Sequence, residues 1–122
     1  MMNLTTSNWD AIAQRIDEVR GIAVAFAARA RDHFGRRLRD IRLFGSAARG
    51  DWQEASDVDV LVVLDDVQPA DRQWLAENAS RIGVLDAGIP LSTVTLSESQ
   101  FGELRKRELL FAKEVERTSI SL

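Results

Sequence analysis

The chain has 122 residues, of which 45% are apolar, and its formal net charge at pH 7 is −3. This length suits a single domain over residues 1–122 with a real core, but not a second, substrate-binding domain. The mildly acidic charge disfavours generic nucleic-acid binding, and the absence of cysteine excludes disulfides and thiolate metal sites. Neither a secretory leader nor a membrane-spanning run is recognisable, so we expect a cytoplasmic protein without membrane association.

The first predicted element is a long helix over residues 8–34. Ser7 and Asp10 resemble a capping box at its start, and Gly35 is placed to end it. Its apolar residues recur at alternating spacings of four and three, which predicts a stripe that packs in the core rather than a groove for a partner. The residues of this stripe are Ile12, Ile16, Val19, Ala23, Phe26 and Ala30.

The most basic part of the chain lies at the end of this helix. His33, the only histidine, has no sequence partner that suggests a nucleophile or a metal site, so we interpret it as structural or exposed. The arginines here either steer a nucleotide or a polyanionic partner towards a site, or form a solvated helix end and loop. They are Arg29, Arg31, Arg36, Arg37, Arg39 and Arg42.

A strand is predicted over residues 39–44, and it ends at the dipeptide Gly45-Ser46. Glycine lets the backbone come close to a ligand, and Ser46 brings a hydroxyl to a turn that is rich in free N–H groups. A helical turn that begins near Ser46 would add a dipole that favours anions. These properties indicate a phosphate site.

The loop that follows carries an arginine and a tryptophan. Arg49 is within reach of a phosphate bound at Ser46, although it could instead neutralise Asp51 or Asp57. Trp52 is expected to anchor the loop, with a cover over the site or a partner contact as the alternatives.

A second strand, over residues 57–64, opens with two aspartates one residue apart. Asp57 and Asp59 share a face because successive strand side chains point to opposite sides. Two like charges at the mouth of a buried strand need a cation or strong hydrogen-bond donors, and Mg²⁺ is the natural candidate. If this strand runs antiparallel to the first, the aspartates meet the Gly-Ser turn. Asp65 and Asp66, at the far end, are assigned to a turn.

A helix and a third strand follow. Pro69 starts a helix predicted over residues 70–86, and Gly88 ends it. A strand over residues 89–96 completes a crossover unit, so it should run parallel to the second strand. The apolar residues of the helix recur at helical spacing and are Leu75, Ala79, Ile82 and Leu85.

The last predicted helix starts at Ser97, which resembles a capping box with Gln100. Residues 118–122 are expected to be frayed or to form a short edge segment. These elements predict an α/β (α+β) fold, a small mixed β-sheet flanked by helices in the order α-β-(short α)-β-α-β-α. The residues of the last helix that can face the sheet are Phe101, Leu104, Phe111 and Val115.

The spacing of Gly-Ser, ten residues and Asp-x-Asp resembles the signature of the DNA polymerase beta-like nucleotidyltransferase superfamily. Gly45, Ser46, Asp57 and Asp59 match that signature position for position. The resemblance implies the polymerase beta-like fold, a Gly-Ser pair that binds a nucleoside triphosphate such as ATP, and aspartates that are catalytic and hold one or two Mg²⁺ ions. The context around these residues is similar to the small bacterial branch, the minimal nucleotidyltransferases.

In this superfamily the third strand commonly carries a third acid, which helps to deprotonate the attacking hydroxyl. The matching position here is Ser92. Asp86 and Glu98 flank the strand, but neither is placed to substitute for that acid. The sequence therefore leaves two main hypotheses open: a nucleotidyltransferase, with AMP transfer from ATP as the first guess, and a weak or inactive nucleotide-binding module of the same fold. A purely structural domain is the least favoured.

The same resemblance implies a partner. Minimal nucleotidyltransferases are often paired with a small helical HEPN protein, as antitoxin to toxin, and some modify that partner with AMP. Because 122 residues leave no room for an acceptor domain, we expect another protein to supply the acceptor. A homo-oligomer remains open.

Overall fold

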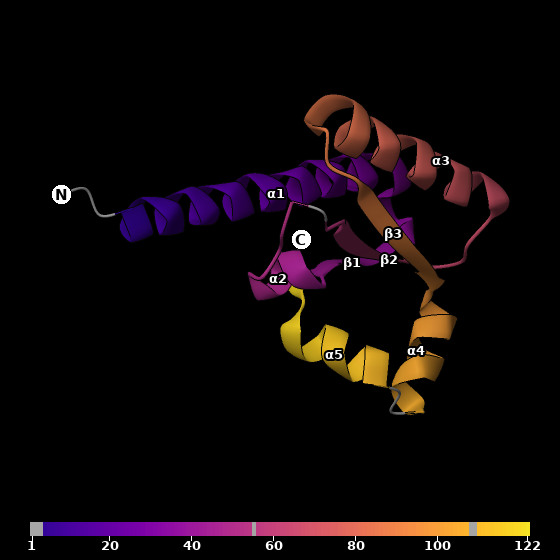
Figure 1. Cartoon of the computed structure of the whole chain (residues 1–122). Coiled ribbons are helices and arrows are strands. Elements are labelled where there is room, and N and C mark those ends of the chain that lie inside the picture. The colour runs from indigo at the N-terminus through magenta and orange to yellow at the C-terminus, as the bar shows by residue number, and fades with distance from the viewer. Residues whose placement is uncertain (1–3, 55, 108–109) are drawn as a thin grey trace.

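The computed structural model describes residues 4–54, 56–107 and 110–122, with side chains for these except in 4–10, 12 and 110–112. Its centre is a four-stranded mixed sheet in the order β3-β2-β1-β4, with helices on both faces (Figure 1). This is the predicted α/β class. None of the helices in these described ranges is long and apolar enough to cross a membrane.

The first element, α1 (Leu4–Phe34), packs the C-terminal part of the predicted stripe into the core, whereas Ile16 is half-buried and lies outside it. Val19, Ala23, Phe26 and Ala30 are fully buried. The helix begins at Leu4, so the prediction that Ser7 caps its N-terminus is wrong; the expected side-chain contacts of Ser7 and Asp10, and the placement of Ile12, lie outside the described side chains. A single turn of 3₁₀ helix, η1 (Gly35–Arg37), then ends the helix at the predicted glycine.

The next two strands form the antiparallel pair that the sequence predicts. β1 (Leu38–Phe44) runs against β2 (Val58–Leu64), and Phe44 lies opposite Asp59. The short helix α2 (Ser46–Arg49) lies in the connection between them. Because of this register, the turn after β1 and the start of β2 lie at the same edge of the sheet.

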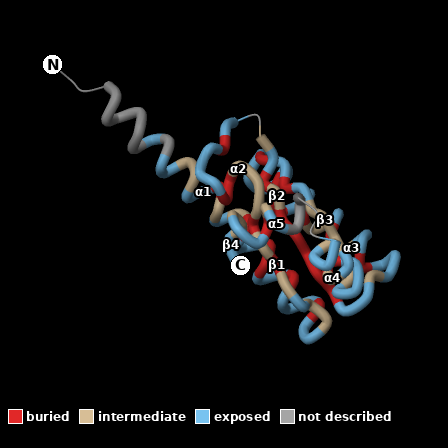
Figure 2. The backbone as a smooth tube through the Cα atoms, turned by 90° about the horizontal axis from the view of Figure 1, so that it is seen from below, coloured by how far each residue is buried: buried red, intermediate tan, exposed pale blue. Residues whose placement is uncertain are grey.

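Successive side chains of β2 point to opposite faces of the sheet and so divide the core into two layers. Val58, Val60, Val62 and Leu64 pack towards α1 and the helix after β2, whereas the intervening residues Leu61 and Val63 pack with Phe101 and Val115. Figure 2 shows the buried residues gathered around the sheet. Asp59 therefore shares its face of β2 with the second, smaller cluster.

The crossover after β2 is built from α3 (Pro69–Ser80) and a π-helical segment, η2 (Arg81–Ala87), which ends at Gly88. The prediction that Leu85 belongs to the buried stripe is wrong, because this side chain is 73% exposed. A π-helix bonds i to i+5, so the side chains leave the 3.6-residue spacing that places Leu75, Ala79 and Ile82 in the core.

β3 (Leu91–Ser97) runs parallel to β2, as the crossover rule predicts, and places Ser92 beside Asp59. At the other edge, β4 (Ile120–Ser121) pairs with β1, so the end of the chain forms the short edge segment.

The C-terminal helix of the prediction is two helices, α4 (Glu98–Lys106) and α5 (Leu110–Thr118). The Ser97–Gln100 capping box is present at the start of α4. A straight helix would carry Val115 roughly 20 Å away from Phe101, yet both pack in one cluster, and Figure 1 shows α5 turning back beneath the sheet. The placement of Phe111 lies outside the described side chains.

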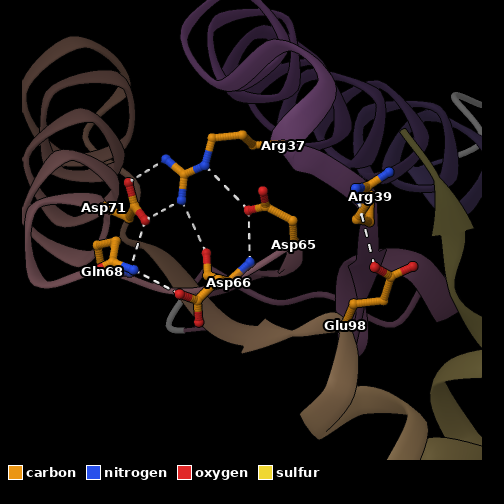
Figure 3. A network of polar contacts seen from close by, with 7 residues as sticks. All are labelled: Arg37, Arg39, Asp65, Asp66, Gln68, Asp71 and Glu98. Carbon is orange, nitrogen blue, oxygen red and sulfur yellow. Dashed lines mark hydrogen bonds and ion pairs between the residues drawn. The ribbon is translucent and has the colours of Figure 1, made fainter.

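Most arginines of the basic segment make contacts within the chain, and the choice between a steering role and a solvated helix end stays a prediction. Arg37 binds Asp65, the backbone carbonyl of Asp66 and the buried Asp71 (Figure 3), so the Asp65-Asp66 turn is structural. His33 stacks on Trp74 with ring centroids 4.1 Å apart. The other contacts are Arg29 to Asn78, Arg31 to the Leu122 carbonyl, Arg39 to Glu98, and Arg42 to Asp40.

Candidate functional site

The turn between β1 and α2 is shaped by Gly45. Its backbone angles are φ 73° and ψ −155°, a region that is essentially reserved for glycine. A Cβ at this position would collide with the Asp59 carboxylate, whose Cγ would lie 3.3 Å away and whose Oδ2 would lie closer still. The backbone of Gly45 and the side chain of Asp59 are therefore in direct contact across the sheet edge.

The predicted site residues converge around this contact. Asp57 lies one residue before β2, and Asp59 is the second residue of that strand. Together they line an open hollow of about 380 Å³ whose remaining wall is Gly45, Ser46, Arg49 and Ser56. The structure thus brings together all five residues that the sequence singled out for nucleotide and metal binding.

The charges of this hollow influence one another. Burial raises the pKa of Asp59, the neighbouring Asp57 carboxylate raises it further, and Arg49 lowers it. Arg49 also forms an ion pair of 3.5 Å with Asp51. The arginine therefore has the neutralising role that the sequence left open, as the counter-ion of Asp51, and it also lines the hollow; its contact with a phosphate stays a prediction.

Two residues that do not line the hollow hold its walls, and the sequence analysis singled out only one of them, Trp52. The Arg20 guanidinium, from α1, donates to the carbonyl oxygens of Ala47 and Ala48 at 2.9 and 3.1 Å. Trp52 is buried and donates from its indole nitrogen to the Ser56 carbonyl at 3.1 Å, so it anchors the loop as expected. The Arg20 contacts span 27 and 28 residues and therefore leave no local sequence signal, whereas the Trp52 bond spans only four.

The donor set suits a hard cation. Asp57 and Asp59 offer carboxylate oxygens, and the pKa of Asp59 is raised first by burial and then by the like charge of Asp57, both of which a bound cation would offset. Within the described ranges, no group of three His, Cys, Asp or Glu side chains is arranged to hold a metal ion. A cation here would complete its coordination with the triphosphate and water, as Mg²⁺ commonly does.

The position of the expected third acid is filled by a hydroxyl. Ser92 lies beside Asp59 in the parallel register of β2 and β3. Glu98 pairs instead with Arg39, and Asp86 lines a separate hollow between α1 and η2. Neither flanking acid joins the aspartate pair, in agreement with the sequence analysis.

A mixed sheet that sets an aspartate pair against a Gly-Ser turn defines the nucleotidyltransferase class, and comparison with known families agrees. Residues 25–117 match the nucleotidyltransferase domain family, so the chain belongs to this family. The resemblance drawn from the Gly-Ser and Asp-x-Asp signature is thereby confirmed.

Two curated relatives have names that are more specific than the family description. A protein of Methanocaldococcus jannaschii, provisionally named a protein adenylyltransferase, is 34% identical over 67 residues, or 55% of this chain and 62% of that protein. The protein adenylyltransferase MntA of Thermococcus cleftensis is 38% identical over 52 residues, or 43% of this chain and 50% of its own length. The match thus spans less than two thirds of either relative.

A solved structure shows the same fold. The crystal structure of a provisionally assigned nucleotidyltransferase from Sulfolobus solfataricus superposes with a TM-score of 0.56 at 19% identity, over 90% of this chain and 84% of that one. The arrangement of sheet and helices described above is therefore a nucleotidyltransferase fold.

Proposed function

We propose that the protein is an Mg²⁺-dependent nucleotidyltransferase that transfers AMP from ATP to a hydroxyl group of another protein. The observation that carries this proposal is the convergence of Asp57 and Asp59 with the Gly45-Ser46 turn in one open hollow. The names of the two curated relatives, both protein adenylyltransferases, support ATP as the donor and a protein as the acceptor.

Each wall of the hollow has a role in this proposal. Gly45 and Ser46 bind the triphosphate, since no Cβ obstructs the turn and Ser46 adds a hydroxyl. Arg49, whose side chain is 43% exposed, contacts a phosphate by exchanging its ion pair with Asp51. Asp57 and Asp59 hold Mg²⁺, which when bound neutralises charge on the phosphates.

The reaction exchanges one bond for another. The acceptor oxygen forms a bond to the α-phosphorus, the bond from that phosphorus to the bridging oxygen breaks, pyrophosphate leaves, and the hydroxyl proton passes to solvent or to a base. Such transfers depend mainly on positioning and on charge neutralisation, which the turn and the aspartate pair can provide.

The acceptor that we propose is a small helical HEPN-type protein, with this chain as the antitoxin of the pair. The support is the likeness to MntA and the exposed position of the site, because Asp57 faces solvent and a macromolecular hydroxyl can reach it.

A second candidate function is nucleotide-gated binding without efficient transfer. The observation that favours it is Ser92 in register with Asp59, at the position of the expected base. A serine hydroxyl is a far weaker base than a carboxylate, so ATP and Mg²⁺ could bind while the acceptor remains protonated.

ATP binding separates both proposals from a structural role. Calorimetric titration should show ATP binding that requires Mg²⁺ and is lost in Asp57→Asn. Asp86→Asn is the matched control, because Asp86 loses the same charge from a different hollow. Binding that does not depend on Mg²⁺, or that survives Asp57→Asn unchanged, would contradict the assigned site.

Label transfer separates the two proposals from each other. With α-labelled ATP and the helical partner, the transferase should label the partner, whereas γ-labelled ATP should leave it unlabelled because the γ-phosphate departs in pyrophosphate. Mg²⁺-dependent binding without transfer from any nucleoside triphosphate would favour the binding module.

A further inference from the structure

We propose that Trp52 is a positioning residue for the aspartate pair: its indole N–H fixes the peptide that precedes Asp57 and thereby sets the separation of the two carboxylates. The expected effect on Mg²⁺ binding rests on the proposed function. The structural content of the inference, an ordered Asp57, can be measured without any ligand.

The first observation is the hydrogen bond of Trp52. The side chain is 6% exposed and belongs to the main core, and its Nε1–H donates to the Ser56 carbonyl at 3.1 Å. A buried indole N–H that lost this acceptor would remain unsatisfied, so the bond is costly to break. The core thus holds one end of the acid-bearing loop.

The second observation is which peptide the bond fixes. The Ser56 carbonyl and the Asp57 N–H belong to one planar peptide unit, so fixing the carbonyl fixes the orientation of that plane. The following peptide is also held, because the Val58 N–H donates to the Pro90 carbonyl at 2.9 Å. Asp57 consequently lies between two anchored peptide planes.

The third observation is that Asp59 is already fixed. Its backbone is paired on both sides, with Phe44 of β1 and Ser92 of β3, and its carboxylate lies against Gly45. Asp57 precedes β2 and lacks this support from the strand. The Trp52 anchor therefore acts on the less constrained member of the pair.

Trp52 is also contacted by an arginine of α1. The Arg15 guanidinium lies over the Trp52 ring at 5.6 Å from its centroid and forms an ion pair of 2.9 Å with Glu54 in the same loop. The loop is thus tied to the core by the indole and to α1 by this arginine. Because Mg²⁺ demands near-ideal octahedral geometry, its affinity should depend on how firmly Asp57 is held.

The test uses Trp52→Phe, which keeps an aromatic ring in the core and removes the indole N–H. Trp74→Phe is the matched control, since Trp74 packs on His33 and Phe34 at the opposite end of β1. The Mg²⁺ concentration that half-saturates ATP binding should rise about fivefold in Trp52→Phe, the change produced by one average hydrogen bond, and should stay at the wild-type value in Trp74→Phe. ATP affinity at saturating Mg²⁺ should change little.

A second readout needs no nucleotide. In amide NMR spectra of the free protein, the Asp57 N–H should shift and lose order in Trp52→Phe, while the Asp59 N–H should keep its strand order. Should Trp52→Phe unfold, site-specific incorporation of the benzothiophene analogue of tryptophan keeps the ring shape and removes only the donor.

The outcomes distinguish this inference from the proposed function. The inference is overturned if Asp57 is as ordered in Trp52→Phe and in the benzothiophene analogue as in the wild type. It is also overturned if Trp52→Phe binds ATP with the same half-saturating Mg²⁺ concentration as the wild type. If the wild type binds no ATP, the proposed function fails, and the order of Asp57 alone still decides whether Trp52 positions it.

Discussion

Gly45 and Asp59 lie so close that a single added methyl group would separate them. Gly45 directly follows β1 and Asp59 lies in the antiparallel strand β2, and the Gly45 backbone, at φ 73°, occupies a conformation that other residues avoid. The close approach of the turn to the acid is therefore built into the backbone.

Gly45→Ala should destabilise the fold and weaken nucleotide binding together. The backbone strain alone costs on the order of 1–3 kcal/mol, and the new Cβ displaces the Asp59 carboxylate. Gly21→Ala is the matched control, because Gly21 lies within α1 and a Cβ added there would meet no atom within 4 Å; it should stabilise the protein by roughly 1 kcal/mol. Chemical denaturation measures the free energy of unfolding, which should fall in Gly45→Ala and rise in Gly21→Ala. A stable Gly45→Ala protein that still binds ATP would disprove the proposed contact.

The aspartate pair should make stability depend on pH. Burial and Asp57 raise the pKa of Asp59, so the folded protein holds this proton more tightly than the unfolded chain. As pH rises from the ordinary carboxylate pKa, about 4, through the raised value, this group lowers stability, and the cost is fully present above it. Asp59→Asn should therefore raise the melting temperature at neutral pH while it abolishes Mg²⁺-dependent ATP binding. The gain should vanish at acid pH; a melting temperature that falls at neutral pH would contradict this reasoning.

Asp71 should make stability depend on pH in the opposite direction. Its carboxylate accepts from the two terminal guanidinium nitrogens of Arg37, Nη1 and Nη2, at 3.0 and 2.7 Å and from the Gln68 N–H, and the Arg37 contact holds its pKa below the usual range. This stabilisation is present above the ordinary pKa and is lost as pH falls through the lowered one. Asp71→Ala should lower the melting temperature at neutral pH, with about 1 kcal/mol from the lost hydrogen bond of the Gln68 N–H alone.

The control for Asp71 lies in the same network. Asp66→Asn keeps the backbone carbonyl to which Arg37 donates and changes only an exposed carboxylate bonded to Gln68 (Figure 3). Thermal melts between acid and neutral pH should show little change in this variant. An equal loss in both variants would mean that the buried carboxylate has no special role.

Local sequence rules predict most of this site because the site is made from strand alternation and one antiparallel register. Two aspartates one residue apart must share a face of a strand, and a strand that returns antiparallel must bring them to the Gly-Ser turn. The crossover rule likewise fixes the parallel direction of β3, and the observed register places Ser92 beside Asp59.

The features that spacing did not predict depend on tertiary contacts. The exposure of Leu85 follows from the π-helical segment, where buried Gly83 packs so close to the Ile89 carbonyl that a Cβ would lie 2.6 Å from it. The break between α4 and α5 returns Val115 to the cluster of Phe101. The contacts of Arg20 with the carbonyls of Ala47 and Ala48, 27 and 28 residues further along the chain, carry no periodic signal at all.

Ser92→Asp tests how far the absence of a third carboxylate lowers the rate of AMP transfer. The strand register places residue 92 beside Asp59, so an aspartate here would add a third acid at the site. If proton abstraction limits transfer, AMP transfer to the partner should rise by on the order of 10²-fold, the usual contribution of a positioned general base. Ser92→Asn, which has the same shape without the charge, is the control and should stay at the wild-type rate, and label transfer from α-labelled ATP measures both. Equal rates in the two variants would show that the acceptor is activated elsewhere, either by its own protein or by solvent.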